Sequence, residues 1–540
     1  NKVSFSASVN ASMGDYENLE GLEINYPTNF WDIDIDGKQQ NDQMSGRILF
    51  DYELSDTTTF GVQYLGNNTK PGLEATTTST IFDNNNNLER TLKNKAQNEV
   101  DNNNHSVNFH LINRLDALGK QVSFDADYFT FTSDRNLDFT TEQFDVSGNS
   151  QGLSSAALNI SNQKIDNFSS QIDMDLPLKK VSLTYGLKAS FTNTDSGVLF
   201  YNTLSGSEVL DPNQSTDFMY KENVLAAYFS GNTKLKNKLT MQFGLRFEDT
   251  KTKGFNASLN QTTPNNYSKF FPSLYFSYAK NDNNNFNFSY GKRINRPNFR
   301  DLNPFRFYIN DNSYSVGNPF LQPSFSDNFE VSHLYKNNWN TSFSVNITTD
   351  GFGVFFNTDI TNQDQIVTRE NYFKKYTYQI QESFSFSPIS WWKSQNDVRM
   401  LVHVTELTKN IDAEVNDGVQ FYAESNNTFL LSERTKIQAN AWYSSFHNDG
   451  LFSLGKLFHL SFGLQHHFKN NIKLSMLFSD VLNTGSLRDY NSTVNGIDQS
   501  YSQNASSRNF RISLSYDFGN KKIKVKNRAF SNDEEQRRSN

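Results

Sequence analysis

The segment 510-FRISLSYDF-518 decides the fold of this chain, because its apolar and polar residues alternate without a break. Every even-numbered position holds an apolar or aromatic side chain, and every odd-numbered position between them holds a polar one. Successive side chains of a β-strand point to opposite faces, so one face of this strand is apolar and the other is polar. A strand of a soluble sandwich shows the same alternation. The distinction therefore depends on how often the pattern recurs.

The alternation recurs along most of the chain, and the connections between the strands are alternately short polar turns and long polar segments. Residues 3–13, 181–192 and 239–248 are regular examples. A face toward lipid that is apolar, a face toward the lumen that is polar, and short turns opposite long loops are typical of transmembrane β-barrels. The sequence predicts an all-β, transmembrane antiparallel β-barrel with about 20 strands in this chain.

The composition agrees with this prediction. The 540 residues are 36% hydrophobic and 14% aromatic, whereas ordinary globular domains are about 45–50% apolar. A barrel coats only one face of each strand with apolar residues and carries aromatic residues at both membrane interfaces. Cysteine is absent, which suits an exported protein and excludes thiolate chemistry and cysteine-ligated metals. The net charge of -8 argues against a nucleic-acid partner.

The predicted domain organisation is a barrel over residues 1–519 and a disordered, charged periplasmic tail over residues 520–540. The tail has a basic run followed by Asp533, Glu534 and Glu535, and it has no apolar core. Barrels place short turns in the periplasm and long loops outside the cell, so both chain ends are expected in the periplasm of a bacterial outer-membrane protein. The expected long loops are residues 14–41, 68–101, 132–162, 194–216, 251–266, 294–324 and 485–502.

A proline-rich segment, 291-GKRINRPNFRDLNPFRFYINDNSYSVGNPFLQP-323, resembles a segment of TonB-dependent receptor-like outer-membrane barrels of the Bacteroidota type. The segment 480-DVLNT-484, the segment 271-FPSL-274 and the basic tail after Phe518 are similar to that family as well. The matching residues of the long segment are Arg293, Asn295, Arg296, Pro297, Asn298, Leu302, Asn303, Pro304, Phe305, Gly317, Asn318, Pro319, Phe320, Leu321 and Pro323.

This resemblance implies a barrel of 22 strands that is closed by an N-terminal plug with a TonB box. The chain has no counterpart of that plug, so we expect it to begin at the third barrel strand of a longer protein, with a plug encoded upstream or supplied in trans. The resemblance also implies that Phe518, the terminal aromatic residue of the last strand, serves in barrel assembly together with Phe510 and Tyr516.

The function implied by the resemblance is energy-coupled import of a scarce ligand, such as an iron chelate, a peptide or a glycan. The implied partners are outer-membrane lipid, the plug and a periplasmic energy-coupling protein. The alternative is a structural or accessory barrel subunit of a larger outer-membrane complex without transport activity, whose partners would include a surface lipoprotein or other subunits. The sequence does not identify ligand-binding residues.

The arginines of the proline-rich segment have two interpretations. Arginine forks recognise carboxylate and phosphate, so Arg293, Arg296 and Arg300 are candidates to bind a ligand. The favoured interpretation is structural: the prolines stiffen a loop that folds inward over the lumen, and Arg293 or Arg296 pairs with a carboxylate inside the barrel.

Three other motifs have a structural interpretation that we favour. Residues 32–37 (DIDIDG) have the spacing of a calcium loop, but Gln43 stands at the twelfth position, and a hairpin with an Asp-Gly turn and with Trp31, Ile33 and Ile35 on one face is favoured. His466 and His467 are adjacent on a strand and point to opposite faces, which disfavours a shared metal ion. The remaining motif is an aromatic group at a short turn, favoured as part of a membrane-interface girdle over ligand stacking: Phe384, Phe386, Trp391 and Trp392.

No catalytic constellation stands out in the sequence. There is no His-Glu-x-x-His and no phosphate-binding glycine loop. We therefore predict neither an enzyme nor a cofactor, and we expect no metal site.

Overall fold

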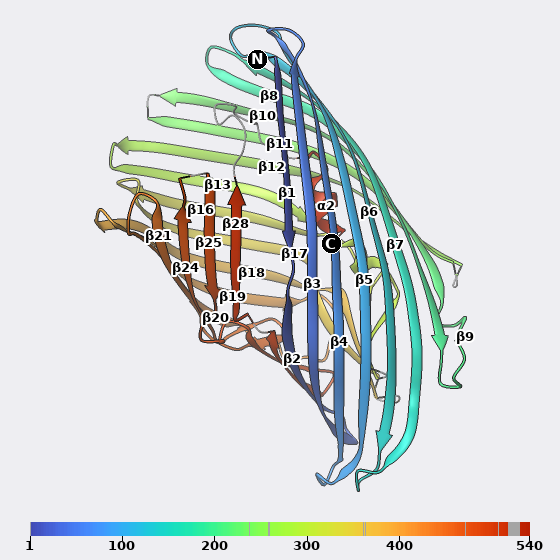
Figure 1. The fold of residues 1–540 in the computed structure, drawn as a ribbon. Coiled ribbons are helices and arrows are strands. Elements are labelled where there is room, and N and C mark those ends of the chain that lie inside the picture. The colour runs from blue at the N-terminus through green and yellow to red at the C-terminus, as the bar shows by residue number, and fades with distance from the viewer. Residues whose placement is uncertain are drawn as a thin grey trace.

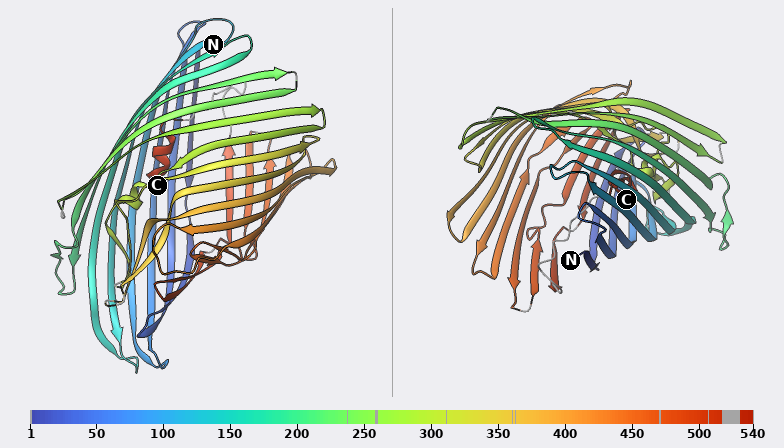
Figure 2. Two further views of the ribbon diagram at one scale, coloured as in Figure 1. Left: turned by 180° about the vertical axis from the view of Figure 1, so that it is seen from behind. Right: turned by 90° about the horizontal axis from the view of Figure 1, so that it is seen from above.

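The computed structural model describes residues 2–236, 238–257, 260–310, 312–359, 361, 363–469, 471–505, 507–516 and 530–539. These residues form one sheet of 28 strands that curves into a ring (Figures 1 and 2). Among the described residues, neighbouring strands pair in antiparallel orientation, except for the short parallel contact between β15 and β18. Neither helix of the described residues is long and apolar enough to span a membrane. The prediction of an all-β, antiparallel sheet is confirmed.

The strands follow one another around the ring in chain order, apart from short strands that lie within the loops. The first fourteen elements are β1 (Val3–Ser12), β2 (Asp15–Asn25), β3 (Asn29–Glu53), β4 (Thr58–Asp83), β5 (Leu88–Arg114), β6 (Gln121–Phe144), β7 (Ser150–Pro177), β8 (Val181–Asn202), β9 (Val209–Leu210), β10 (Thr216–Lys236), β11 (Leu239–Asn256), β12 (Gln261–Asn281), β13 (Asn284–Asn295) and α1 (Phe299–Leu302). The others are β14 (Arg306–Asn310), β15 (Ser313–Val316), β16 (Ser324–Tyr335), β17 (Trp339–Asp359), β18 (Asp364–Ile389), β19 (Trp392–Leu407), β20 (Gly418–Leu430), β21 (Thr435–Ser444), β22 (His447–Asp449), β23 (Phe452–Leu454), β24 (Leu457–His467), β25 (Ile472–Ser479), β26 (Leu487–Val494), β27 (Ile497–Ala505), β28 (Asn509–Tyr516) and α2 (Asp533–Arg538).

Several of the predicted long loops are extended strands. Segments 14–41, 68–101 and 132–162 belong to the hairpins of β2 to β7, and β3 pairs with β4 without interruption from Asn29 opposite Asp83 to Glu53 opposite Thr59. Much of the segment 68–101 is polar on both faces, so it lacks the hydrophobic alternation from which strands are recognised. Pairing with the neighbouring strand nevertheless satisfies its backbone hydrogen bonds. The wall therefore continues well beyond the apolar part of each strand.

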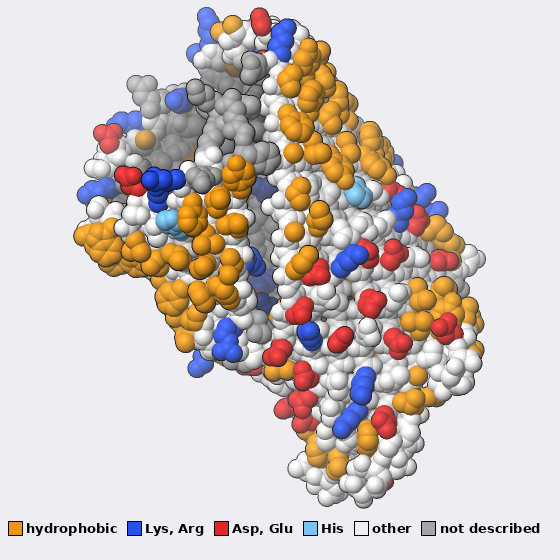
Figure 3. Space-filling view, viewed as in Figure 1, with side chains coloured by type: hydrophobic (Ala, Val, Ile, Leu, Met, Phe, Trp, Pro, Cys, Tyr) orange, Lys and Arg blue, Asp and Glu red, His pale blue; other side chains and the backbone are white. Residues whose placement is uncertain are grey.

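On the face that Figure 3 shows, exposed apolar side chains gather over the half of the sheet that is nearer the short turns. On β28 the side chains of Phe510, Ile512, Leu514 and Tyr516 are all exposed, and so are Arg511 and Ser513 between them. The outward facing of the apolar residues stays a prediction. Phe518, the predicted assembly residue, lies outside the described residues. The other half of the wall carries mainly polar and charged side chains (Figure 3). The surface thus divides into an apolar level and a polar level.

The two ends of the sheet meet at only one of these levels. At the long-loop end β2 pairs with β27, from Asn18 opposite Ala505 to Asn25 opposite Asp498. At the apolar level β1 pairs with β3, β28 pairs with β25, and the described residues show no pairing between β1 and β28. Figure 3 shows a slit between these two strands, through which interior side chains are visible. The strand count of the complete barrel stays a prediction.

The predicted disordered tail is wrong for its last residues. Residues 533–538 form the helix α2, which lies inside the ring beside the marked C-terminal end (Figure 2). Its side chains Glu535, Gln536 and Arg538 are buried. Charged side chains fold here because the lumen supplies partners for them, which a count of apolar residues cannot reveal. Residues 520–529 of the predicted tail lie outside the described residues.

Candidate functional site

The proline-rich segment folds into the lumen, as predicted. We call residues 296–323 the motif loop. Four of its apolar side chains are buried against inward-facing residues of β6, β7, β8 and β10. Burying a large apolar side chain contributes about 1.5–3 kcal/mol, so this cluster is enough to hold the loop against the wall. The members of the cluster are Phe129, Phe131, Ile165, Val198, Phe218, Tyr220, Phe299, Leu302, Phe305 and Leu321.

Gly317 and Asn318 close the base of the motif loop. A Cβ atom at position 317 would overlap the carbonyl oxygen of Asn303 and would lie 2.8 Å from that of Asp301. Only glycine allows this approach of two backbone segments. The backbone N–H of Asn318 donates to the carbonyl of Asp301 at 2.6 Å. Asn303, Gly317 and Asn318, which were assigned to the family motif from the sequence, thus have a structural role, which is to shape the loop.

Arg296 is the central cation of the lumen. Its Nη2 lies 2.6 Å from Glu248 of β11, and its Nη1 lies 2.6 Å from Glu534 of α2. Its Nε donates to the hydroxyl of Tyr267 at 3.2 Å. The Arg296 side chain is only 3% exposed, so these partners replace the water that it loses. The prediction that Arg296 pairs with a carboxylate is confirmed, whereas a role in binding a ligand is not tested.

A second buried arginine, Arg538, reaches the wall from the C-terminal helix. Its guanidinium donates to both carboxylate oxygens of Glu222 on β10, at 2.5 and 3.1 Å. Its Nε donates to the carbonyl of Pro297 at 2.9 Å, and the group lies 4.3 Å from the ring centre of Phe299. A bidentate pair combined with ring stacking is the geometry for which arginine is suited. Arg538 therefore joins the motif loop to β10.

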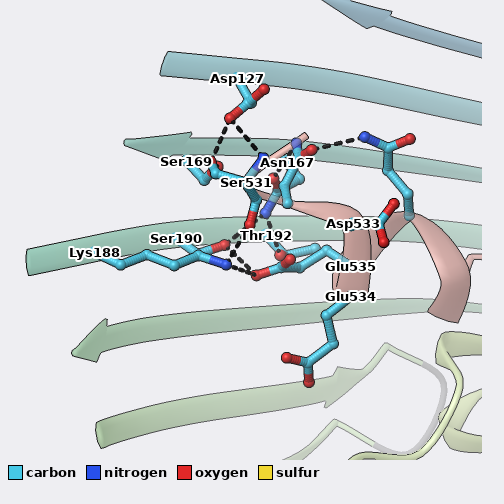
Figure 4. Close-up of polar contacts among 12 residues, drawn as sticks. Asp127, Asn167, Ser169, Lys188, Ser190, Thr192, Ser531, Asp533, Glu534 and Glu535 are labelled. Carbon is cyan, nitrogen blue, oxygen red and sulfur yellow. Dashed lines mark hydrogen bonds and ion pairs between the residues drawn. The ribbon is translucent and has the colours of Figure 1, made fainter. Parts of the chain in front are cut away.

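The residues before Arg538 contact the polar inner faces of β6, β7 and β8 (Figure 4). Ser531 bonds to Asp127 through both its hydroxyl and its backbone N–H. The fully buried Asn532 donates to Asn167 at 2.9 Å. On β8, the hydroxyl of Ser190 donates to Glu535 at 2.6 Å. These contacts form a continuous row of hydrogen bonds between the segment and the wall.

A separate cavity lies at the long-loop end of the ring. The tip of the β17–β18 hairpin reaches across this end: the hydroxyl of Tyr26 donates to the carbonyl of Gln363 at 3.0 Å, and Gln365 donates to Gln499 at 2.6 Å. Because β18 and β3 lie far apart around the sheet, these contacts bridge the opening. Beside the bridge is a cavity of about 540 Å³, which we call the mouth pocket. Its volume is in the usual range for sites that bind small molecules.

The mouth pocket is predominantly apolar, and aromatic side chains form much of its lining. Its charged groups are Glu20, Lys375 and Asp449, of which Lys375 and Asp449 are paired at 2.6 Å. Glu20 accepts a hydrogen bond of 2.8 Å from Tyr501, and burial together with this carboxylate raises the pKa of Tyr501. The aromatic lining residues are Phe356, Tyr372, Phe373, Phe452, Tyr490 and Tyr501.

Residues 32–37 lie in a strand and not in a turn. Gly37 pairs with Asn18 on one side and Ala75 on the other, and the turn of this hairpin lies at residues 26–29. The predicted Asp-Gly turn is therefore wrong, because strand pairing continues through it. Trp31 and Ile33 are buried on one face, and Ile35 packs against the same cluster, as predicted. Among the described residues no group of three or more His, Asp or Glu side chains is placed to hold a metal ion.

The other candidate residues lie apart from the lumen contacts. Arg293 and Asn295 are exposed residues of β13, paired in register with Ser326 and Ser324 of β16. At the short-turn end, the rings of Phe386 and Trp392 lie 6.0 Å apart, and those of Trp339 and Phe384 lie 5.1 Å apart. His466 bonds to Thr435 at 2.8 Å. Pro304 and Pro319 are partly buried in the motif loop.

Sequence reasoning missed Glu222, Glu248 and the C-terminal residues. Glu222 and Glu248 stand at inward positions of polar strand faces, where many residues are charged, so their pairing was not visible. Glu534 and Arg538 did leave a signal, since they are of opposite charge and four residues apart, a spacing that puts both on one helix face. The mouth pocket combines residues from five hairpins and leaves no local motif.

Comparison with known proteins agrees with this fold. The model of the outer membrane protein beta-barrel family matches residues 113–516. The ferripyoverdine receptor of Pseudomonas aeruginosa, solved bound to ferripyoverdine, has a TM-score of 0.54 at 11% identity over 91% of this chain and 72% of that one. The ferric-catecholate import receptor Fiu of Escherichia coli K12 has a TM-score of 0.55 at 9% identity over 91% of this chain and 81% of that one. No curated protein sequence matches the chain.

Proposed function

Because this chain belongs to the outer membrane protein beta-barrel family, we propose that it is the barrel of a TonB-dependent receptor that imports a scarce ligand. The observation that carries the proposal is the mouth pocket, an apolar cavity of ligand size at the long-loop end of a polar lumen. A barrel that only scaffolds other subunits has no need of such a cavity. The similar solved receptors act on ferripyoverdine and ferric catecholates.

The orientation that we propose places the long-loop end outside the cell and the short turns in the periplasm. The mouth pocket then faces the medium, where a ligand arrives, and both chain ends are periplasmic. The exposed apolar side chains would contact the outer-membrane lipid.

We propose that the barrel closes with 22 strands. Unpaired backbone groups are very costly in hydrocarbon, and at the apolar level the described parts of β1 and β28 each pair with a single neighbour. Two further strands between them would satisfy both edges. A plug, encoded upstream or supplied by another polypeptide, would then close the lumen and respond to a periplasmic energy-coupling protein.

The lining of the mouth pocket narrows the class of ligand. Two of its charged groups, Glu20 and Asp449, are carboxylates, and its one cation, Lys375, is already paired with Asp449. A strongly anionic chelate would lose its hydration there without gaining a free cation. A ligand with an aromatic or aliphatic part and no net negative charge fits better. Of the three ligand classes, we propose a neutral or basic peptide.

Growth with a limiting nutrient tests this function. Three probes are compared as limiting sources: a neutral aromatic peptide, a ferric catecholate and an oligosaccharide. We expect deletion of the gene to reduce growth on the peptide alone, and we expect the restored gene to act only in cells with an intact inner-membrane energy-coupling system. A deletion that leaves all three uptake rates unchanged but disturbs the assembly of a neighbouring outer-membrane complex would instead support the accessory subunit.

A further inference from the structure

The C-terminal segment 530–539 lies in a site of the lumen wall that matches its charges. Two ion pairs join the segment to its surroundings, one to Arg296 of the motif loop and one to Glu222 of the wall. The segment offers the opposite charges in Glu534 and Arg538. These two residues are four positions apart on α2, so one helix face presents both. In these two ion pairs each side therefore contributes one acid and one arginine.

Arg538 is buried, whereas its neighbour in the sequence, Arg537, is exposed. The Arg538 side chain is 6% exposed, and its partner Glu222 is 3% exposed. The side chain of Arg537 is 74% exposed, and its ion pair with Asp533 of the same helix is 4.0 Å long. A buried charge that loses its partner is strongly unfavourable, whereas an exposed ion pair contributes little to stability. The contact therefore depends on the position of an arginine and not on the number of positive charges.

We propose that this lumen site is a docking site for a short helix that carries a glutamate and an arginine four residues apart, and that its occupant is the chain's own segment 530–539. The docked segment joins the motif loop to the wall through Arg296 and Glu222. A molecule that passes along strands β5 to β11 has to displace it. This docking does not depend on import activity.

One feature makes the segment displaceable. Glu535 is buried, and its Oε1 accepts a hydrogen bond from Ser190 and lies 3.9 Å from Nζ of Lys188, yet its Oε2 has no hydrogen-bond partner among the described residues. An unsatisfied buried oxygen costs free energy that release into water recovers. Two short ion pairs therefore stabilise the docked segment, and one poorly satisfied carboxylate destabilises it.

Thiol labelling of the full chain tests the docking, because the native sequence contains no cysteine. Ser539→Cys places a near-isosteric probe at a buried position of the segment, and Ser147→Cys places a reference probe at an exposed turn. A membrane-impermeant maleimide is applied to outer-membrane vesicles. We expect the Ser539→Cys probe to react at least tenfold more slowly than the Ser147→Cys reference. Equal rates would overturn the proposal.

Charge reversal tests the recognition of the two charges. Arg538→Glu and Glu222→Arg should each accelerate labelling of the Ser539→Cys probe about tenfold, and the two together should restore slow labelling. Arg537→Glu, one residue away, should leave the rate unchanged. Folding of each variant is checked by its heat-dependent mobility on semi-native gels, and Arg538→Gln replaces Arg538→Glu if the latter does not fold. Equal effects of the Arg537 and Arg538 substitutions, or fast labelling of a folded double variant, would overturn the proposal.

Discussion

The two interior sites of this barrel differ in how they are held together. The lumen site is built from buried charges, with Arg296 between Glu248 and Glu534, and Arg538 on Glu222. The mouth pocket is built from aromatic and aliphatic side chains, and its ionic groups are satisfied by one another or by hydrogen bonds. The first site is occupied by the chain itself, and the second is a cavity.

This difference has a physical consequence for what each site can bind. A buried ion pair is favourable only with near-ideal geometry, so a site of this kind selects one partner and rejects others. Binding in an apolar cavity gains its free energy from the apolar area that is buried, so the cavity tolerates ligands of different shape. The lumen site therefore suits one specific internal segment, and the mouth pocket suits a ligand that is exchanged with the medium.

The largest effect is expected from Glu248→Gln. Glu248 pairs with both Arg296 and Arg246, and removing one partner of a buried pair costs about 3–5 kcal/mol. The unfolding temperature on semi-native gels should fall markedly, whereas Glu208→Gln, in an exposed loop, should leave it unchanged. Equal unfolding temperatures for the two variants would show that the lumen charges do not hold the structure.

A smaller loss of stability is expected from Gly317→Ala. The new methyl group would overlap the carbonyl of Asn303, and forcing additional atoms into a packed region costs about 1–3 kcal/mol. The motif loop should loosen and become a substrate for an arginine-specific protease at Arg300 and Arg306. Gly291→Ala, whose added atom meets nothing within 4 Å, should stay resistant. Cleavage of both variants or of neither would contradict a structural role for the motif glycine.

The sequence predicted the wall and the motif loop because both leave local patterns. Alternation at residues 510–516 predicted an outward apolar face, and the prolines and arginines near Arg296 predicted an inward loop with a paired cation. The C-terminal segment was missed because its burial rests on charges of distant strands, such as Glu222, and not on its own composition. The hairpin at residues 68–101 was missed since polar strands lack the apolar period on which strand prediction depends.

The mouth pocket should respond in binding and not in stability. Phe356→Ala removes one aromatic wall of the pocket and should weaken binding of a fluorescent neutral aromatic peptide about tenfold, which corresponds to about 1.4 kcal/mol. Labelling of a Ser539→Cys probe in the same protein should not change, because the two sites share no lining residue. Tighter binding of a ferric catecholate than of the peptide to the native protein would refute the proposed ligand class.

The smallest effect is expected from Tyr501→Phe, which removes one hydrogen bond to Glu20 at the mouth. The net contribution of such a bond is about 1 kcal/mol, and Glu20 keeps two other donors, Asn18 at 2.6 Å and Gln503 at 3.1 Å. Since burial and Glu20 raise the pKa of Tyr501, the folded protein holds this phenol protonated where an unfolded chain starts to lose its proton. The contribution of this hydrogen bond to stability is then fully present below the unfolded pKa of about 10 and is lost only as the pH rises through the higher folded pKa.

The difference in unfolding temperature between the native protein and the Tyr501→Phe variant should stay constant from pH 6 to about pH 9, with the native protein always higher. A difference that disappears near pH 8 would show that the phenol titrates normally and that the Glu20 contact is open to water.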